Sequence, residues 1–313
     1  MSARWRLALR ALLVSVSLAA FAGGARVAWA GEAGSFLIVN SDTTVEKYRS
    51  PQAAFLATVT LPTSEIDLGA GAAAERGLRA LIRKADPGVI YCVGTRAYLS
   101  TLGVARGRKI VVSSAINWER LPASQTTYGI ASELSPAMQL TTFRYLFPEI
   151  RRIGILYSRE FQQETVRDAR AAAAELGMTL EFKSVRSQPD VERSLKPLLE
   201  KVDALWLIPD PVVLGSLEAM HRIFEQCDRV KKPIFAYESV YAHEGAVLTV
   251  APDVPTIGRQ AATLAEQIVQ GKPLTKRFQN PAGSEVILNL RKVREYGLKI
   301  SDDALESVNS IIE

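Results

Sequence analysis

The chain has 313 residues, of which 38 are Lys or Arg and 33 are Asp or Glu, so its formal net charge is +5. Four of the arginines and none of the acids lie in residues 1–30, which leaves residues 31–313 with a net charge of +1. Nucleic-acid binding requires a clustered basic surface, so the overall composition gives no indication of a nucleic-acid partner.

The first thirty residues have the pattern of a secretory signal peptide. Three arginines form a positive segment, residues 11–25 carry no charge, and Ala28-Trp29-Ala30 has the small-x-small form of a cleavage site. The uncharged run is shorter than the roughly 20 apolar residues of a membrane span. No cysteine precedes Cys92, so a lipid anchor has no attachment point in this pattern. We expect cleavage near Gly31 and a soluble periplasmic protein.

Residues 31–133 alternate short apolar runs with helical patterns. Strands are predicted over residues 36–39, 65–68, 89–93 and 109–113, the second of them a charged edge strand. Helices are predicted over 45–59 and 72–85, with a break in the first at Pro51. Four strands with intervening helices indicate a parallel sheet.

The same alternation starts again after residues 127–133. Strands are predicted over residues 152–158, 179–185, 204–208 and 233–237, and helices over residues 135–147, 160–176, 191–201 and 212–230. Two successive series of this kind indicate two similar lobes. The predicted fold class is therefore α/β, with two doubly wound parallel-sheet lobes joined by a hinge.

Polar residues follow six of the predicted strands, three in each lobe. They include Asn40, Ser41, Thr95, Arg96, Ser113 and Ser114 in the first lobe, and Tyr157, Ser158, Asp210, Tyr237 and Glu238 in the second. In an open parallel sheet the carboxyl ends of the strands face the ligand crevice. These residues are therefore candidates for binding a small ligand. The alternative is that hydroxyl and carboxylate groups at strand ends only cap the helices that follow.

Enzyme and cofactor signatures are sparse. Residues 69–74 match a Gly-x-Gly-x-x-Ala dinucleotide fingerprint, but the preceding strand is short and charged, so a tight turn is the better interpretation. His221 and His243 stand alone, which argues against a metal site. Cys92 and Cys227 fall in different predicted lobes and are expected to be buried thiols without a disulfide. We expect no enzyme activity, no cofactor and no metal.

Four stretches in the second part of the chain carry a family resemblance. They read "DALWLIPDPVV", "KKPIFAYES", "EGAVLTVAPDVPTIGRQAATLAEQIVQGKP" and "VILNLRKVREYGLKI", in that order. The chain resembles the substrate-binding proteins of ABC importers with the type I periplasmic-binding fold, in the group that includes tryptophan- and tyrosine-binding members. The resemblance covers residues 128–313.

The resemblance implies a domain organisation and a function. The first lobe would comprise residues 31–129 and 251–282, and the second residues 130–250 and 283–313. The two lobes would close on a small solute, such as an amino acid or an aromatic compound, and a monomer would deliver it to an ABC permease in the inner membrane. A ligand-sensing receptor subunit for a membrane signalling protein is the alternative that this fold leaves open.

The resemblance also implies roles for the candidate residues. Thr95 and Ser113-Ser114 would hold a carboxylate, although Arg96 could bind it in bidentate fashion instead. Asp210 would pair with an ammonium group, and the two strand-end tyrosines would bound the rest of the ligand. On this interpretation we expect Asp210→Ala to weaken the binding of an ammonium-bearing ligand without unfolding the protein.

Overall fold

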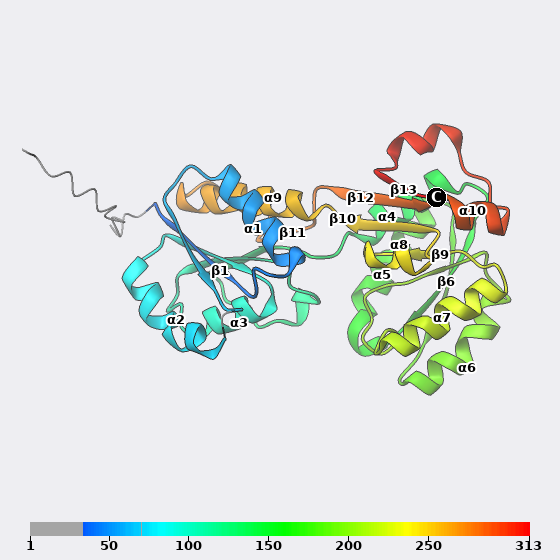
Figure 1. Cartoon of the computed structure of the whole chain (residues 1–313), viewed down its shortest axis with the longest axis horizontal. Helices are drawn as coiled ribbons and strands as arrows, with labels where there is room; N and C mark the ends of the chain where they lie inside the picture. The colour runs from blue at the N-terminus through cyan, green and yellow to red at the C-terminus, as the bar shows by residue number, and fades with distance from the viewer. Residues whose placement is uncertain (1–33, 70) are drawn as a thin grey trace, which may run out of the picture. The chain divides into compact units, whose positions relative to one another are not determined.

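The computed structural model describes residues 34–69 and 71–313, so the expected signal peptide lies outside the described residues. These residues form two separate β-sheets with helices on both faces of each (Figure 1). We call each sheet with its helices a lobe. The arrangement confirms the predicted fold class of two doubly wound α/β lobes.

The first sheet has the strand order β11-β5-β4-β3-β1-β2, and every pair in it is parallel. Its strands are β1 (Phe36–Asn40), β2 (Thr63–Asp67), β3 (Val89–Val93), β4 (Lys109–Ser113), β5 (Thr127–Ile130) and β11 (Phe278–Gln279). The four predicted strands are all present, and β2 is an edge strand as expected. The pattern analysis missed β5 and β11 because neither is a continuous apolar run.

The central strands of this sheet are buried on both faces, and alternate residues face different helices. Tyr91 lies in the core cluster beneath α1 (Glu46–Thr58) and α9 (Val254–Val269). The next residue, Cys92, lies in the cluster beneath α2 (Ala72–Ala85) and α3 (Thr95–Leu102). This is the period of two that a pleated strand imposes.

The predicted break at Pro51 is wrong, because α1 continues through this residue. Pro51 removes one backbone donor from the helix, but it is buried where α1 packs against α9. A Cβ atom added to Gly258 of α9 would lie 2.2 Å from the Pro51 carbonyl oxygen. The two helices therefore touch through their backbones, and this packing offsets the missing hydrogen bond.

The second sheet has the strand order β13-β12-β10-β9-β8-β6-β7, in which only the β10–β12 pair is antiparallel among the described strands. Its strands are β6 (Arg152–Tyr157), β7 (Thr179–Ser184), β8 (Ala204–Trp206), β9 (Ile234–Ala236), β10 (Leu248–Pro252), β12 (Ser284–Asn289) and β13 (Ser310–Ile312). Its helices are α4 (Pro136–Leu146), α5 (Arg159–Glu175), α6 (Gln188–Leu199), α7 (Leu217–Arg229), α8 (Val240–Glu244) and α10 (Leu290–Tyr296). The chain thus passes between the sheets after β5, after β10 and after β11; the exact domain boundaries stay a prediction.

The helix predicted from Val212 starts only at Leu217. Residues 212–215 form a turn, and Ser216 is the residue that caps α7, its Oγ accepting a hydrogen bond from the Ala219 N–H at 3.1 Å. The helical spacing of apolar residues extends into the turn because Val213 also packs into the core of this lobe. Hydrophobic period alone therefore placed the helix start too early.

Both cysteines are buried and unpaired, as predicted. Burial raises the pKa of the Cys92 thiol to about 12 and that of the Cys227 thiol to about 12. The two thiols lie in different lobes, Cys92 on β3 and Cys227 on α7.

No helix in the described part of the chain combines the length and the apolar character that crossing a membrane requires.

Candidate functional site

A cavity of about 460 Å³ is lined by residues from both lobes. The first lobe contributes the start of α1, the segment after β4 and the start of α9. The second lobe contributes the segment after β9 and parts of β10 and β12. The carboxyl ends of β4, β5 and β9 therefore lead into this cavity, which is where an open parallel sheet places a ligand.

The charged side chains that line this cavity are mostly acidic. The carboxylates are Glu46, Glu133, Glu238, Asp253 and Glu285, and the cation is Lys47. Three of these carboxylates are ion-paired: the Lys47 Nζ lies 3.2 Å from the Glu238 Oε1, the Arg259 Nη2 lies 3.3 Å from the Asp253 Oδ2, and Glu46 pairs with Arg49. The Glu133 Oε1 accepts a hydrogen bond from the Asn117 N–H at 3.1 Å. The side chains that line the cavity thus include more acidic than basic groups, which favours a ligand with a positive group.

Tyr237 brings a phenol into the same cavity. Its hydroxyl lies 3.3 Å from the Tyr241 hydroxyl. Burial, the neighbouring Tyr241, and the carboxylates of Glu238 and Glu133 all raise the pKa of Tyr237. The phenol is therefore protonated at neutral pH and can donate or accept a hydrogen bond, and its ring offers a face on which an apolar or aromatic ligand group can pack.

Two serines add polar groups to the lining. Ser114, directly after β4, has a left-handed backbone with φ of 55°, a conformation that is uncommon for a residue other than glycine. The Ser132 Oγ is buried and has no hydrogen-bond partner among the described residues. A buried hydroxyl without a partner costs free energy, so a ligand that bonds Ser132 would relieve that cost.

A second cavity of about 420 Å³ shares Glu133 and Pro209 with the first. At its rim the Arg120 guanidinium lies 3.3 Å from the Glu160 carboxylate and 4.1 Å from the centre of the Phe161 ring. These contacts join the loop after β4 in the first lobe to the start of α5 in the second.

The predicted residues at the end of β1 serve the local structure. The Asn40 side chain donates to the Tyr48 carbonyl at 3.0 Å and accepts from the Asp42 N–H at 2.9 Å. The Ser41 Oγ accepts from the Ala97 N–H at 3.0 Å and so caps α3. Both residues are buried, and neither lines the two cavities.

The predicted residues around α3 and β4 are also occupied by protein groups. Thr95 is the first residue of α3. The Arg96 guanidinium lies 3.3 Å from the Glu75 carboxylate, at the surface. The Ser113 Oγ is buried 2.7 Å from the Tyr91 hydroxyl. None of these three lines either cavity.

In the second lobe, Asp210 holds two strand ends together. Its carboxylate accepts hydrogen bonds from the Ser158 N–H at 2.6 Å, the Ser158 hydroxyl at 2.8 Å, and the N–H groups of Val212 and Val213 at 2.9 and 3.1 Å. Asp210 is only 1% exposed. Tyr157 is buried too, with its ring edge-on to Phe182. These residues lie behind the cavities and do not line them.

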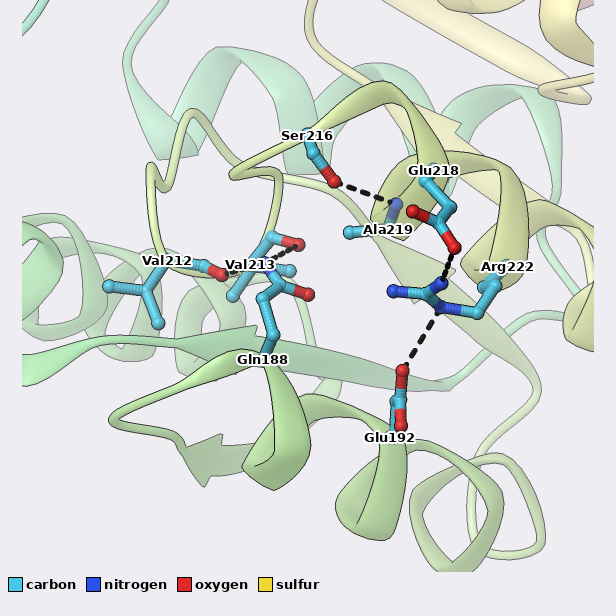
Figure 2. A network of polar contacts seen from close by, with 8 residues as sticks. All are labelled: Gln188, Glu192, Val212, Val213, Ser216, Glu218, Ala219 and Arg222. Carbon is cyan, nitrogen blue, oxygen red and sulfur yellow. Dashed lines mark hydrogen bonds and ion pairs between the residues drawn. The ribbon is translucent and has the colours of Figure 1, made fainter.

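The loop that carries Asp210 is tied down from its other side. Figure 2 shows Gln188 of α6 donating to the Val212 carbonyl and Arg222 of α7 lying between two carboxylates. Its Nε lies 3.0 Å from Glu192 and its Nη1 lies 2.6 Å from Glu218. The hydrogen bonds from Gln188 and to Asp210 hold the loop that begins at Pro209. Pro209 itself lines both cavities.

Of the eleven predicted residues, the structure brings Ser114, Tyr237 and Glu238 together in the first cavity. It adds residues that the sequence analysis missed, among them Lys47, Ser132, Glu133 and Asp253. Ser132 and Glu133 follow β5. Because β5 was not predicted, the search for polar residues at the carboxyl ends of strands did not include them. Lys47 and Asp253 lie at helix starts and carry no local signal. Among the described residues, no group of three His, Cys, Asp or Glu side chains is placed to hold a metal ion.

Comparison with known proteins identifies a matching family. Residues 104–312 match the model of the ABC transporter substrate binding protein family. A tyrosine-binding protein of Clostridioides difficile (strain R20291) is 22% identical over 193 residues, which is 58% of this chain and 53% of the relative. The chain thus spans about half the length of that relative.

Two solved structures have the same fold. The ABC domain from Streptococcus pneumonia in complex with L-Trp gives a TM-score of 0.60 at 15% identity, over 89% of this chain and 99% of that one. The ligand-free, open structure of a substrate-binding protein with adhesive properties from Clostridium difficile gives 0.69 at 14% identity, over the same shares. With the family match over residues 104–312, we conclude that this chain belongs to the ABC transporter substrate-binding protein family.

Proposed function

We propose that this protein is the periplasmic solute-binding component of an ABC importer and that its solute is an amine-bearing compound, such as an amino acid with an aromatic side chain. The observation that carries the proposal is the acidic cavity around Tyr237, lined from both lobes, in a member of a substrate-binding family. The two relatives named for tyrosine and L-Trp support an aromatic amino acid.

The proposed site places the ammonium group between Glu133, Glu238 and the Tyr237 hydroxyl. Carboxylates hold an ammonium group through charge-assisted hydrogen bonds, which are stronger than neutral ones. We prefer this position to Asp210, whose carboxylate already accepts four hydrogen bonds within its own lobe. The buried Ser132 hydroxyl, which has no hydrogen-bond partner among the described residues, remains to contact a polar group of the solute, whereas Lys47 stays paired with Glu238.

The proposed mechanism is a population shift. A solute that contacts Ser114 of the first lobe and Tyr237 of the second lobe at once favours the state in which both lobes reach it. The first lobe would comprise residues 31–129 and 251–282, with the second made of 130–250 and 283–313. The protein would act as a monomer after removal of its signal peptide, deliver the solute to a permease in the inner membrane, and carry out no catalysis.

Thermal unfolding against a panel of solutes tests the proposal. The protein is first unfolded and refolded to remove any solute bound during expression, and then mixed with amino acids, aromatic amines, aromatic acids, sugars and nucleosides. A ligand at about 100 times its dissociation constant adds roughly 2.7 kcal/mol to the free energy of unfolding. We expect amines to stabilise the protein and the matching acids without an amine to have no effect. Stabilisation by sugars alone would contradict the proposed site.

Two variants locate the site once a ligand is known. We expect Glu133→Gln and Tyr237→Phe each to weaken binding about tenfold or more, because each removes a group that faces the amine. Glu175→Gln at the exposed end of α5 is the matched control and should bind normally. If all three variants bound the ligand as tightly as the unmodified protein, the ligand would not bind in this cavity.

A further inference from the structure

The positive charge of the protein is concentrated in one segment. Residues 75–109 contain eight Lys or Arg and two acids, a net charge of +6, whereas the rest of residues 31–313 carries −5. This segment includes most of α2, α3 and the loop to β4. Residues 31–313, with a net charge of only +1, therefore contain one strongly basic region.

Three arginines of this region form a stripe on α2, which we call the α2 stripe: Arg76, Arg79 and Arg83. Their spacing of three and four residues places them on one face of the helix, and all three are exposed. The opposite face, with Leu78 and Ile82, is buried against the sheet. At 1.5 Å per residue the stripe is about 10 Å long.

The structure shows no acidic partner for the α2 stripe among residues 34–69 and 71–313. Only two acids belong to this region, and both are occupied: Glu75 lies 3.3 Å from Arg96, and Asp86 lies 2.5 Å from Arg108. Among the described residues, the three arginines of the stripe have no ion pair. Like charges at this spacing destabilise a helix.

Helix α7 of the second lobe shows the contrast. Its two arginines are each paired with a carboxylate four residues away, the half-buried Arg222 with Glu218 at 2.6 Å and the exposed Arg229 with Glu225 at 3.2 Å. The two helices are of similar length, yet only α2 leaves a row of guanidinium groups facing solvent. Unlike α7, α2 therefore carries exposed arginines that no carboxylate of the described residues neutralises.

We propose that the α2 stripe, with the exposed Arg106 beyond its carboxyl end, docks the protein on an anionic phospholipid surface. Arginines near an anionic leaflet each strengthen binding about fivefold. Attraction of this kind would hold the protein close to a membrane and shorten its search for a membrane-bound partner. The docking surface is separate from the solute cavity, whose lining includes none of these arginines.

A lipid surface fits this region better than a protein partner. Protein interfaces have a core of apolar and aromatic side chains, and the exposed face of α2 carries no exposed large apolar residue. The stripe also runs along α2 towards the amino ends of the strands, away from the strand ends that lead to the solute cavity. Binding to a flat layer of lipid phosphates requires only positive charges on an exposed surface of the protein.

Vesicle binding tests the proposal. The full chain is expressed, its processed N-terminus is read by mass spectrometry, and the protein is mixed with phosphatidylcholine vesicles with or without phosphatidylglycerol. We expect co-sedimentation only with the anionic vesicles, and its loss at high salt, which screens exposed charges. The triple variant Arg76→Gln/Arg79→Gln/Arg83→Gln should bind roughly a hundredfold more weakly, because it removes three contributions of about fivefold each. Glutamine keeps the helix propensity of arginine, so the variant should fold.

The control variant also removes three positive charges, but from the second lobe. Lys201→Gln/Arg291→Gln/Arg294→Gln changes three exposed cations of the second lobe and should bind anionic vesicles within about twofold of the unmodified protein. Equal loss in both triple variants would reduce the effect to net charge and overturn the proposal. Binding to duplex DNA or to polyglutamate, but not to the vesicles, would overturn it as well. Both triple variants should keep solute-induced stabilisation, so a failure here is distinct from a failure of the proposed function.

Discussion

Asp210 shows how much one buried carboxylate does for the second lobe. It follows β8, and through Ser158 it fixes the end of the neighbouring strand β6. It also closes the turn at Val212 and Val213. Four donors converge on this carboxylate, so a side chain that presents fewer acceptors leaves buried N–H groups unsatisfied.

We therefore expect Asp210→Asn to lower the free energy of unfolding by about 2–4 kcal/mol, because the amide NH₂ would face donors in place of an acceptor oxygen. Ser158→Ala removes one of the four hydrogen bonds and should cost only about 1 kcal/mol. Urea unfolding at neutral pH measures both. Unchanged stability of Asp210→Asn, together with a loss of solute affinity, would contradict this structural role and return Asp210 to the solute site.

At the scale of elements, the contact between α1 and α9 depends on the absence of a side chain. A Cβ at Gly258 would lie 2.2 Å from the Pro51 carbonyl oxygen, and the backbone atoms there cannot rotate away. Gly77 is also inside a helix, α2, but an added Cβ would meet only Leu81 at 4.0 Å. A side chain at Gly258 would therefore clash with α1, whereas one at Gly77 has room.

We expect opposite effects of the same substitution at these sites. Gly258→Ala should lower the free energy of unfolding by about 3 kcal/mol, because α9 must move away from α1. Gly77→Ala should raise it by about 0.5–1 kcal/mol, because alanine favours a helix and fits the space. Thermal or urea unfolding compares them directly. Stabilisation by Gly258→Ala would show that the two helices are not in backbone contact.

The elements themselves were largely predictable. β3 and β4 are continuous apolar runs with Gly or polar residues at their ends, and such runs predict buried strands without further context. The errors have physical causes: Pro51 is tolerated because α1 is held by tertiary packing, and Val213 continues a helical spacing although it lies in a turn. Short strands such as β11 exist only through their pairing partner, which no local pattern reveals.

The site was less predictable than the fold. The expectation that ligands bind at the carboxyl ends of the strands pointed to the edge of each sheet that leads into the cavity. Most of the polar groups there bond to the protein itself, however: Ser41 caps α3, and Asp210 binds Ser158. Which polar groups remain for a ligand depends on these partners. The acidic character of the cavity also depends on Glu133 and Asp253, which come from segments far apart in the sequence.

For the whole molecule, the decisive feature is that the hydrophobic core is divided. The buried clusters of the described residues are each built from one lobe: two flank the first sheet and two flank the second. None of them joins buried side chains of both lobes. Such a molecule is expected to depart from two-state unfolding, because each lobe has a core of its own.

The two cysteines report on the two lobes separately. Burial raises the pKa of both Cys92 and Cys227 to about 12. At pH 8 only about one thiol in ten thousand would then be a thiolate, the reactive form. Labelling by a thiol reagent therefore requires unfolding of the lobe concerned. We expect Cys92 and Cys227 to become reactive at different urea concentrations, as read by mass spectrometry of the labelled peptides.

Solute binding should change the urea concentrations at which the two cysteines become reactive. A solute that contacts Ser114 of the first lobe and Tyr237 of the second stabilises the state in which both lobes are folded. It should therefore raise the urea concentration at which the less stable lobe unfolds and bring the two labelling midpoints together. Arg76→Gln/Arg79→Gln/Arg83→Gln serves as a control with an unaltered cavity and should show the same convergence. Coincident midpoints without solute would mean that the lobes unfold as one unit despite their separate cores. Closure around a ligand requires two lobes that can move relative to each other. Lobes that unfold separately without solute, and together with it, would meet this requirement.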